Sequence, residues 1–566
     1  MTTIKTTTTK ATKNKMTPST LRIGTRYRAG RLNGPYDAII IGSGMGGLTT
    51  AACLSKAGKK VLVLEQHYTA GGFTHSYARN GYEWDVGVHY IGDMGYPTIA
   101  RKLFDYVTNS QLQWAPMDSI YDRFYFGSEH YDLKAGKENF VECLAEHFPE
   151  ERSALEKYVA MLDKINSLVP VFSADKLMPE VLAKAYNLAK WKLLPAYFDQ
   201  TTYEALSTIT RNEKLIQVLC GQWGDCGVPP RKSSFLIHAL IAKHYIHGGY
   251  YPVGGASRIA ETMIPVIQEG GGDVLTYADV KKICAHNGKV SGVVMADGHI
   301  IPCDTIISNA GVFNTFDRLL PQNLVQKYGY DHKLKTVQPS MSHLGMYIGL
   351  KETAQELNLP KTNFWIYPDY SPEQNIETFL NDKESEFPVV YVSFPSAKDP
   401  SWQKRYPGTA TIEIVAPTHY DWFAPWKDKV WGKRGKDYDQ LKTGFEQRLL
   451  EILYQKLPQL RGKIDYYETS TPLSTDYFCA YRKGEIYGLE HDPDRFKQTW
   501  LRPKTRIPGL YLTGQDILTC GIVGALMAGV GTAQSILGLK GLKLINDLRT
   551  NHANYSEGAF VVSSTS

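Results

Sequence analysis

Two short apolar runs near the N-terminus flank a segment of helical composition. The runs are Ala38 to Ile41 and Val61 to Leu64, and Leu48 to Lys56 lies between them. Uninterrupted apolar runs of this length are typical of strands buried on both faces of a parallel sheet. The pattern therefore predicts a strand, a helix and a second strand over residues 36–66, the opening unit of an α/β fold.

The middle of the chain shows a second change from helix to strand. A helix is expected from about Tyr251 to Gln268, where Gly270 to Gly272 ends it. The next segments alternate like antiparallel strands, with Asp297-Gly298 as a hairpin turn. These segments are Val274–Leu275, Asp279–Ile283, Val290–Met295 and His299–Cys303. Thr305 to Gly311 then returns to a buried strand and a loop.

The C-terminal part combines sheet and helix patterns. Residues 340–420 contain the alternating runs of an antiparallel sheet, and Tyr438 to Leu457 is an amphipathic helix that ends at Pro458. Leu510 to Leu512 is predicted to be a strand, and Gly521 to Leu539 an apolar helix rich in small residues. That helix is long enough to cross a membrane, but its glycines and the preceding turn favour a buried position.

Residues 101–249 are expected to be mostly helical, and one stretch within them allows two interpretations. From Asp175 to Tyr197, lysines and Trp191 interleave with apolar residues. A basic amphipathic helix of this kind can lie in a membrane interface, or it can cover the core of a soluble protein. Both interpretations stand, with the core slightly favoured.

Length and charge separate a basic tail from a nearly neutral body. The 566 residues, 43% hydrophobic and 21% charged, are ordinary for a globular protein of at least two domains. The net charge of +6 arises in residues 1–35, which hold basic residues from Lys5 to Arg31 and no acidic one. We expect a disordered tail there, with an organelle transit peptide as the alternative and no secretory signal. A basic excess confined to a tail argues against a nucleic-acid partner.

The eight cysteines suggest neither disulfides nor a metal. They form no Cys-x-x-Cys pair and no zinc-like spacing with histidine. Reduced thiols, no metal site and a cytoplasmic or peripheral membrane location are therefore expected.

The glycines after the first strand carry the first specific chemistry. Gly42-x-Gly44-x-x-Gly47 allows a tight turn, close approach of a pyrophosphate and close packing of helix on strand, in that order. The helix N-terminus offers N–H groups to phosphates. Glu65 ends the second strand, where a carboxylate binds ribose hydroxyls and disfavours the extra phosphate of NADP. The arrangement predicts a Rossmann-type dinucleotide-binding domain.

Two further segments resemble the FAD-dependent amine oxidase and phytoene desaturase superfamily. Gly71-Gly72 resembles its second glycine motif, although Phe73 stands where the superfamily usually has Arg. Thr513 to Asp516, with the helix from Gly521, resembles its C-terminal motif, in which Asp contacts the ribityl or pyrophosphate part of FAD. The resemblance implies that FAD is the cofactor. The residues expected to bind it are Gly42, Ser43, Gly44, Met45, Gly46, Gly47, Glu65, Gln66, Gly71, Gly72, Val280, Gly514, Asp516, Gly521 and Ile522.

Motifs along nearly the whole chain are more specific. They include Asp85-x-Gly87-x-His89-Tyr90, Gly227-Val228-Pro229-Pro230, Tyr251-Pro252-x-Gly254-Gly255 and Thr519-Cys520-Gly521. With these motifs the chain resembles the retinol saturase (all-trans-retinol 13,14-reductase) family, within the phytoene desaturase and carotenoid isomerase group. The resemblance implies FAD, with NAD(P)H as a candidate reductant, and saturation of one double bond in an apolar polyene. Retinoids, carotenoids and unsaturated lipids are the substrates to consider.

His89 and Tyr90 are the candidate catalytic residues, because they follow a flavin-binding segment. A polyene receives a hydride on one carbon and a proton on the other, and either side chain could assist the proton. His89 could equally be a hydrogen-bond partner of the cofactor. His238, His244 and Tyr245 are weaker candidates.

Other activities and the domain division complete the expectations. A redox-neutral isomerase or an oxidative desaturase of carotenoids or fatty acids is the runner-up, and a flavin-free lipid carrier is disfavoured. The FAD-binding domain is expected to be discontinuous, with an α+β substrate domain of antiparallel sheet and helices inserted into it. The first comprises residues 36–100, 250–315 and 490–545; the second comprises residues 101–249 and 316–489. Residues 1–35 and 546–566 are the tails.

Overall fold

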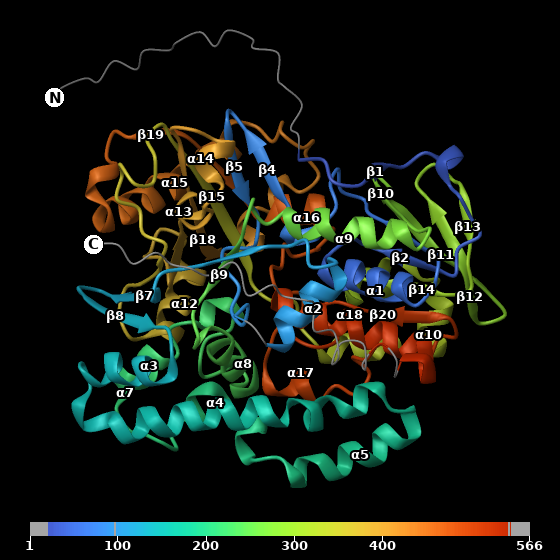
Figure 1. Cartoon of the computed structure of the whole chain (residues 1–566), viewed down its shortest axis with the longest axis horizontal. Coiled ribbons are helices and arrows are strands. Elements are labelled where there is room, and N and C mark those ends of the chain that lie inside the picture. Colours follow the sequence, from blue (N-terminus) through green and yellow to red (C-terminus); the bar gives the residue numbers. More distant parts are fainter. Residues whose placement is uncertain (1–20, 96–97, 542–543, 545–566) are drawn as a thin grey trace.

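A six-stranded parallel sheet forms one half of the molecule (Figure 1). The structure, a computed structural model, describes residues 21–95, 98–541 and 544. Every pair of neighbouring strands in this sheet is parallel, and β2 and β3 are buried throughout. The spatial order is β1 (Thr25–Arg26), β10 (Asp273–Thr276), β3 (Val61–Leu64), β2 (Ala38–Ile41), β14 (Ile306–Ser308) and β20 (Leu510–Leu512). The predicted α/β fold class is confirmed.

Three helices cover one face of this sheet. Helix α1 (Met45–Lys56) packs against both α9 (Arg258–Glu269) and α18 (Gly521–Leu537). A Cβ on Gly529 of α18 would lie 2.6 Å from the Cβ of Thr49 in α1, so the missing side chain permits this close approach. Among the described helices, only Gly521–Lys540 has the length and composition to cross a membrane, and 39% of that stretch is buried.

A small antiparallel sheet covers the other face. It consists of β11 (Val280–His286), β12 (Lys289–Met295) and β13 (Ile300–Pro302), and the predicted hairpin at Asp297-Gly298 joins the last two. The antiparallel assignment of Val274–Leu275 is wrong, because these residues belong to β10 and pair in parallel with β3. A strand that follows a crossover helix returns in the same direction as the first strand.

The expectation of a wholly disordered N-terminal tail is also wrong. Thr25 and Arg26 form the edge strand β1, and Ala29–Arg31 form a 3₁₀ turn. The Tyr27 N–H donates to the Thr276 carbonyl at 2.8 Å, so main-chain pairing with β10 orders this segment. Residues 1–20 and the C-terminal tail from residue 545 lie outside the described residues.

A seven-stranded sheet forms the core of the other half. It is antiparallel except between β16 and β7, and it confirms the sheet expected over residues 340–420. The order is β19 (Ile464–Ser470), β15 (Ser342–Leu350), β18 (Ala410–Thr418), β17 (Val390–Ser393), β16 (Asn363–Tyr367), β7 (Ile120–Phe126) and β8 (Glu129–Lys134). Residues 101–249 are mostly helical, as expected, and the last two strands are the main exception: β7 pairs with β16, far along the chain, and β8 pairs with β7.

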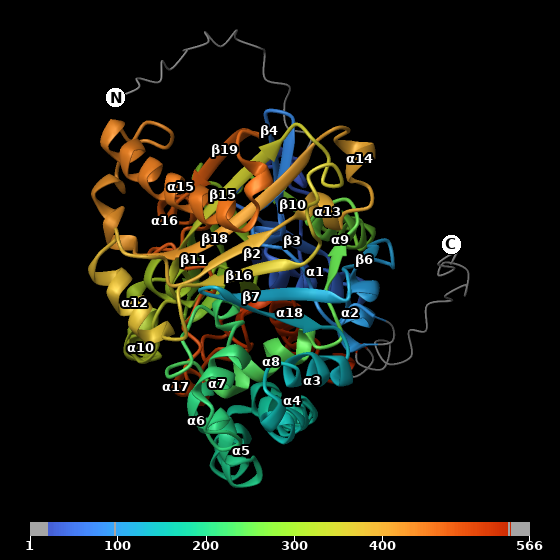
Figure 2. The same cartoon turned by 90° about the vertical axis from the view of Figure 1, so that its left-hand side faces the viewer.

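Helix α2 (Ile99–Val107) lies against α1, and the other helices of that region lie together beyond β7 and β8 (Figures 1 and 2). These are α3 (Lys137–Ala145), α4 (Arg152–Ser173), α5 (Glu180–Leu193), α6 (Thr202–Leu206), α7 (Glu213–Leu219) and α8 (Phe235–Tyr245). Helix α15 (Lys436–Lys456) lies on the outside of the large sheet, and its bounds agree closely with those of the predicted amphipathic helix. The segments β4 (Ser76–Arg79), β5 (Tyr82–Asp85), α16 (Pro472–Cys479) and α17 (Pro493–Lys497) complete the frame around the site.

Candidate cofactor and substrate site

One cavity of about 800 Å³ extends between the two halves of the molecule. Its first wall lies at the carboxyl ends of the parallel strands, where Gly42, Glu65, Asn309 and Thr513 follow β2, β3, β14 and β20. This edge is where open α/β sheets bind their ligands. Its second wall belongs to the large sheet and to α8, and is mostly apolar and aromatic.

Most of the residues expected to bind the cofactor line this cavity. They are Gly42, Gly44, Met45, Gly46, Glu65, Gln66, Gly71, Gly72, Val280, Gly514, Asp516, Gly521 and Ile522. Ser43 and Gly47 do not line it. Ser43 is fully buried behind Glu65, and a Cβ on Gly47 would lie 2.2 Å from the Gly42 carbonyl oxygen, so Gly47 serves the packing of α1 on β2.

Two distant turns meet in this wall. A Cβ on Gly46 would lie 2.6 Å from both Cα and N of Gly514, so bare backbone from the first motif packs on bare backbone from the last. Gly42 has φ +97, a conformation that L side chains rarely adopt. The Asn309 side chain fills the space beside these glycines. Sequence reasoning missed Asn309, although its position after the buried strand β14 was a usable signal.

Glu65 presents a partly satisfied carboxylate to the cavity. Its Oε2 accepts hydrogen bonds from the backbone N and the Oγ of Ser43, at 2.8 and 2.7 Å, and its Oε1 accepts one from the His67 N–H at 2.8 Å. A carboxylate oxygen can accept two hydrogen bonds, so Oε1 keeps one position for a ligand hydroxyl. Ser43 thus positions Glu65 and does not itself line the cavity.

The C-terminal motif contributes a second carboxyl group and a helix N-terminus. Asp516 Oδ2 accepts a hydrogen bond from the Val312 N–H at 2.8 Å, whereas its buried Oδ1 has no partner among the described residues. Arg495 donates to the carbonyl oxygens of Gln515 and Asp516 and so holds this turn. The N-terminus of α18, at Gly521, faces the cavity and supplies the positive end of the helix dipole. An unpartnered acceptor, glycine cradles and a helix N-terminus fit a hydroxyl-bearing dinucleotide.

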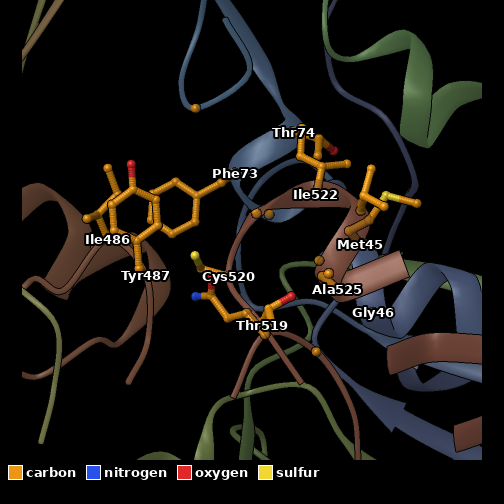
Figure 3. Close-up of a pocket in the computed structure, with 18 of the residues that line it drawn as sticks. Met45, Gly46, Phe73, Thr74, Ile486, Tyr487, Thr519, Cys520, Ile522 and Ala525 are labelled. Carbon is orange, nitrogen blue, oxygen red and sulfur yellow. The ribbon is translucent and has the colours of Figure 1, made fainter. Parts of the chain in front are cut away.

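Aromatic side chains close the cofactor region (Figure 3). Phe73, from the turn Gly72–Thr74, points toward Ile486 and Tyr487, and its ring stacks on that of Tyr481 at 6.3 Å. Cys520 lies nearby, just before α18. The apolar ring of Phe73 therefore occupies the position at which the superfamily usually has an arginine.

His89 is held as a neutral imidazole. Its Nδ1 lies 2.8 Å from Glu413 Oε2, and its ring lines the cavity. Burial lowers the pKa of His89 to about 3, and burial raises the pKa of Glu413. Desolvation therefore disfavours the charged form of both groups in this contact.

The hydroxyl of Tyr90 is held by a hydrogen bond, and its ring stacks on a neighbouring tyrosine. Its O–H donates to Asp122 Oδ2 at 2.8 Å, and its ring stacks on Tyr245 at 4.0 Å. Gln222 and Asn363 also donate to Asp122, at 2.9 and 3.0 Å. Tyr90 therefore presents its ring to the cavity while its polar end is fixed behind.

The weaker histidine candidates separate in the structure. His238 lies in the core with its Nε2 2.9 Å from the Tyr158 hydroxyl, and it does not line the cavity. His244 and Tyr245 do line it, and the Gly92 N–H donates to His244 Nε2. Asp225, Trp365, Tyr391 and Tyr487 line the same wall. Trp365 and Tyr391 belong to an aromatic-rich part of the sequence that suits an apolar tunnel, and Tyr487 to a motif shared with the family, whereas no sequence pattern marked Asp225.

The fold and the cavity define an oxidoreductase built on a Rossmann-type dinucleotide-binding domain. Residues 40–107 match the NAD(P)-binding Rossmann-like domain family. The structure is similar to an oxidoreductase from Methanosarcina mazei, with a TM-score of 0.58 and 17% identity, over 88% of this chain and 99% of that one.

Sequence comparison gives the family. The chain is 38% identical over 530 residues to all-trans-retinol 13,14-reductase of Homo sapiens, covering 90% of this chain and 87% of that protein. It is 26% identical over 522 residues to chloroplastic prolycopene isomerase of Daucus carota, covering 90% and 81%. The chain belongs to the all-trans-retinol 13,14-reductase family.

Proposed function

We propose that this protein is an FAD-dependent reductase that saturates one carbon–carbon double bond of a long apolar polyene, with a retinoid as the first candidate. The observation that carries the proposal is the continuity of one cavity, from the dinucleotide cradle of β2 and β20 to an aromatic chamber. The human relative is named for a retinol double-bond reduction, which is chemistry of this kind.

The residues of the first wall would hold FAD. Gly44 and Gly46 would lie against the pyrophosphate, Glu65 would accept from the adenosine ribose, and Asp516 would face the central part of the cofactor. Bound there, FAD supplies hydride-transfer chemistry. We propose that residues 36–100, 250–315 and 490–545 form the cofactor domain and residues 101–249 and 316–489 the substrate domain.

The second wall would bind and orient the polyene. It is lined by Tyr90, Tyr245, Trp365, Tyr391 and Tyr487, with Leu236, Ile237, Leu240 and Ile241 from α8. Such a wall excludes water and fixes an uncharged chain by shape alone, which places one double bond against the reactive edge of the cofactor. We propose that His89 and Tyr90 position substrate and cofactor at this junction.

A second candidate function follows from the relatives. The prolycopene isomerase relative is named for a reaction that moves no hydrogen in net terms, and its chain is matched over the same span. An isomerase would use the same cradle and the same aromatic wall. The mass of the product separates the two functions.

We also propose that the cavity receives its substrate from a lipid bilayer. Helix α4 lines the cavity through Val169 and Ser173, and α5 packs beside it, where Tyr186 donates to the Val171 carbonyl. The outer face of α5 is apolar and exposed, with Val181 80% and Leu188 82% exposed. An amphipathic helix of this kind suits a membrane interface.

The test is anaerobic turnover of the purified flavoprotein. The protein is reduced with dithionite, mixed with all-trans-retinol, and the product is weighed by mass spectrometry; NADPH and NADH then replace dithionite to find the reductant. A gain of two hydrogens supports the reductase, and NAD(P)H consumption would identify the nicotinamide, for which the sequence offers no second glycine motif. Unchanged mass with altered retention supports the isomerase, and a colourless protein would contradict both.

A further inference from the structure

Asp225 is a carboxyl group in the cavity wall that neither the cofactor cradle nor the aromatic stack accounts for. It ends the 3₁₀ turn Trp223–Asp225, is partly buried and lines the cavity. Its backbone carbonyl accepts a hydrogen bond from Cys520 Sγ at 3.7 Å, so it adjoins the N-terminus of α18. Asp225 thus lies where the cofactor region passes into the aromatic chamber.

One oxygen of the Asp225 carboxyl group lacks a hydrogen bond that would stabilise a negative charge. Its Oδ2 is buried and has no partner among the described residues. Asp122, by contrast, accepts from Tyr90, Gln222 and Asn363. Gln222 connects the two groups, because its side chain donates to Asp122 and its carbonyl accepts from the Asp225 N–H at 3.0 Å.

These surroundings favour protonation of Asp225 more strongly than protonation of Asp122. Burial, followed by the negative charge of Asp122, raises the pKa of Asp225 well above its usual value, and the Tyr90 hydroxyl alone opposes that rise. Burial also raises the pKa of Asp122, but hydrogen bonds from Asn363, Tyr90 and Gln222 oppose that rise. Two neighbouring carboxyl groups whose environments push their pKa values apart form an acid and a base.

We propose that Asp225 is the catalytic acid that delivers the proton to the polyene, an inference that rests on the proposed reductase function. The double bond receives a hydride from the reduced flavin at one carbon and the Asp225 proton at the other. Its π bond breaks, two C–H bonds form, the flavin is oxidised, and Asp225 is left as a carboxylate that regains a proton from water.

The other polar groups at the junction are less suited to this step. The Nδ1 atom of His89 is engaged with Glu413, and the imidazole carries no additional proton to donate. The hydroxyl of Tyr90 donates its proton to Asp122, which does not line the cavity. Asp225 alone among the three combines an acidic proton with a surface on the cavity.

The test compares Asp225→Asn with Asp225→Glu and with the control Asp118→Asn, whose carboxyl group is at the surface and 56% exposed. Flavin content and retinol-induced fluorescence quenching are measured first, then single-turnover oxidation of the reduced flavin by retinol. Asp225→Asn should slow that oxidation at least about 100-fold, because it cannot donate an acidic proton. It should keep its flavin and its retinol binding, Asp225→Glu should recover part of the rate, and Asp118→Asn should match the parent. A rate within about threefold of the parent for Asp225→Asn overturns the proposal.

A second measurement needs no substrate and separates this inference from the proposed function. A carboxyl group with a raised folded-state pKa stabilises the fold at low pH and loses that contribution as pH rises through the folded value. The melting temperature of Asp225→Asn relative to the parent should therefore increase from pH 4 to pH 8. A constant difference overturns the assignment of a protonated Asp225 even if the wild type reduces retinol. If this melting-temperature difference increases with pH but the wild type reduces no polyene, the protonated Asp225 is supported and the proposed reaction is overturned.

Discussion

Gly46 shows at the scale of one residue how the two halves of the cofactor cradle are joined. A Cβ there would lie 2.6 Å from backbone atoms of Gly514, which cannot yield as a flexible side chain would. We expect Gly46→Ala to separate the two turns, lowering bound flavin by more than half and the stability by about 1–3 kcal/mol. The ratio of flavin to protein absorbance and the melting temperature measure both effects.

Gly444 provides the matched control, because it is also helical and a Cβ there meets nothing within 4 Å. Gly444→Ala should keep all flavin and raise stability by up to about 1 kcal/mol, since alanine favours helix. Full flavin content in Gly46→Ala would show that the cradle does not need this contact.

His89 carries a prediction about pH. Because burial lowers its pKa to about 3, the imidazole stays neutral in the folded protein from pH 5 to pH 8. His89→Ala should keep its flavin and lose turnover, by up to about 100-fold through misplacement of its neighbours. The shape of the rate profile between pH 5 and pH 8 should be the same in parent and variant. An inflection near pH 6.5 that disappears in the variant would show that His89 titrates.

At the scale of elements, the sequence predicted that α5 is an amphipathic helix, but it did not determine which face of the helix is buried. The sequence indicated an amphipathic helix with either a lipid or a core partner. In the structure the buried side chains are Ala183 and Lys190, whose Nζ lies 2.9 Å from Asp175, while the leucines face outward. The core interpretation is therefore wrong for the apolar face of this helix. The buried face of α5 instead contributes Lys190 to an ion pair with Asp175.

The exposed face leads to a test with vesicles. Leu188→Asp removes a side chain that is 82% exposed and adds a charge, so binding to phosphatidylcholine and phosphatidylserine vesicles should weaken about tenfold. Ile300→Asp is the control, because Ile300 is 59% exposed on β13, far from α5. Flotation on a density gradient measures bound protein. Equal binding of both variants would remove α5 from the membrane contact.

The strands β7 and β8 show the same limit for a sheet. Their residues lie in a region whose composition predicted helices, yet β7 pairs in parallel with β16, with Asn363 opposite Asp122. The side chain of Asn363 also donates to the Asp122 carboxylate. The pairing of β7 with β16 cannot be predicted from the local sequence of β7, because a strand is stabilised by the neighbouring strand, which lies far away along the chain.

At the scale of the whole molecule, the cofactor would connect parts of the chain that are far apart in sequence. The cradle takes residues from Gly42, Glu65, Val280 and Asp516. Flavin binding should therefore stabilise the entire fold, by about 2.7 kcal/mol at a free concentration 100 times Kd. Thermal unfolding of apoprotein with and without added FAD measures the shift. The Glu65→Gln variant should show a smaller shift, and an identical shift would remove Glu65 from the ribose contact.

What the sequence determined by itself was local. Apolar runs gave β2 and β3, glycine spacing gave the turn at Gly42, and the segment ending at Asp516 gave the second part of the cradle. Such features follow from the chemistry of a few adjacent residues, so they can be read in order along the chain. The tertiary structure alone decided that Ser43 supports Glu65, that Tyr90 is fixed to Asp122, and that one carboxyl oxygen of Asp225 has no partner among the described residues. Those roles depend on burial and on partners brought together by folding, and the surroundings in which the fold places a carboxyl group decide how far its pKa is shifted.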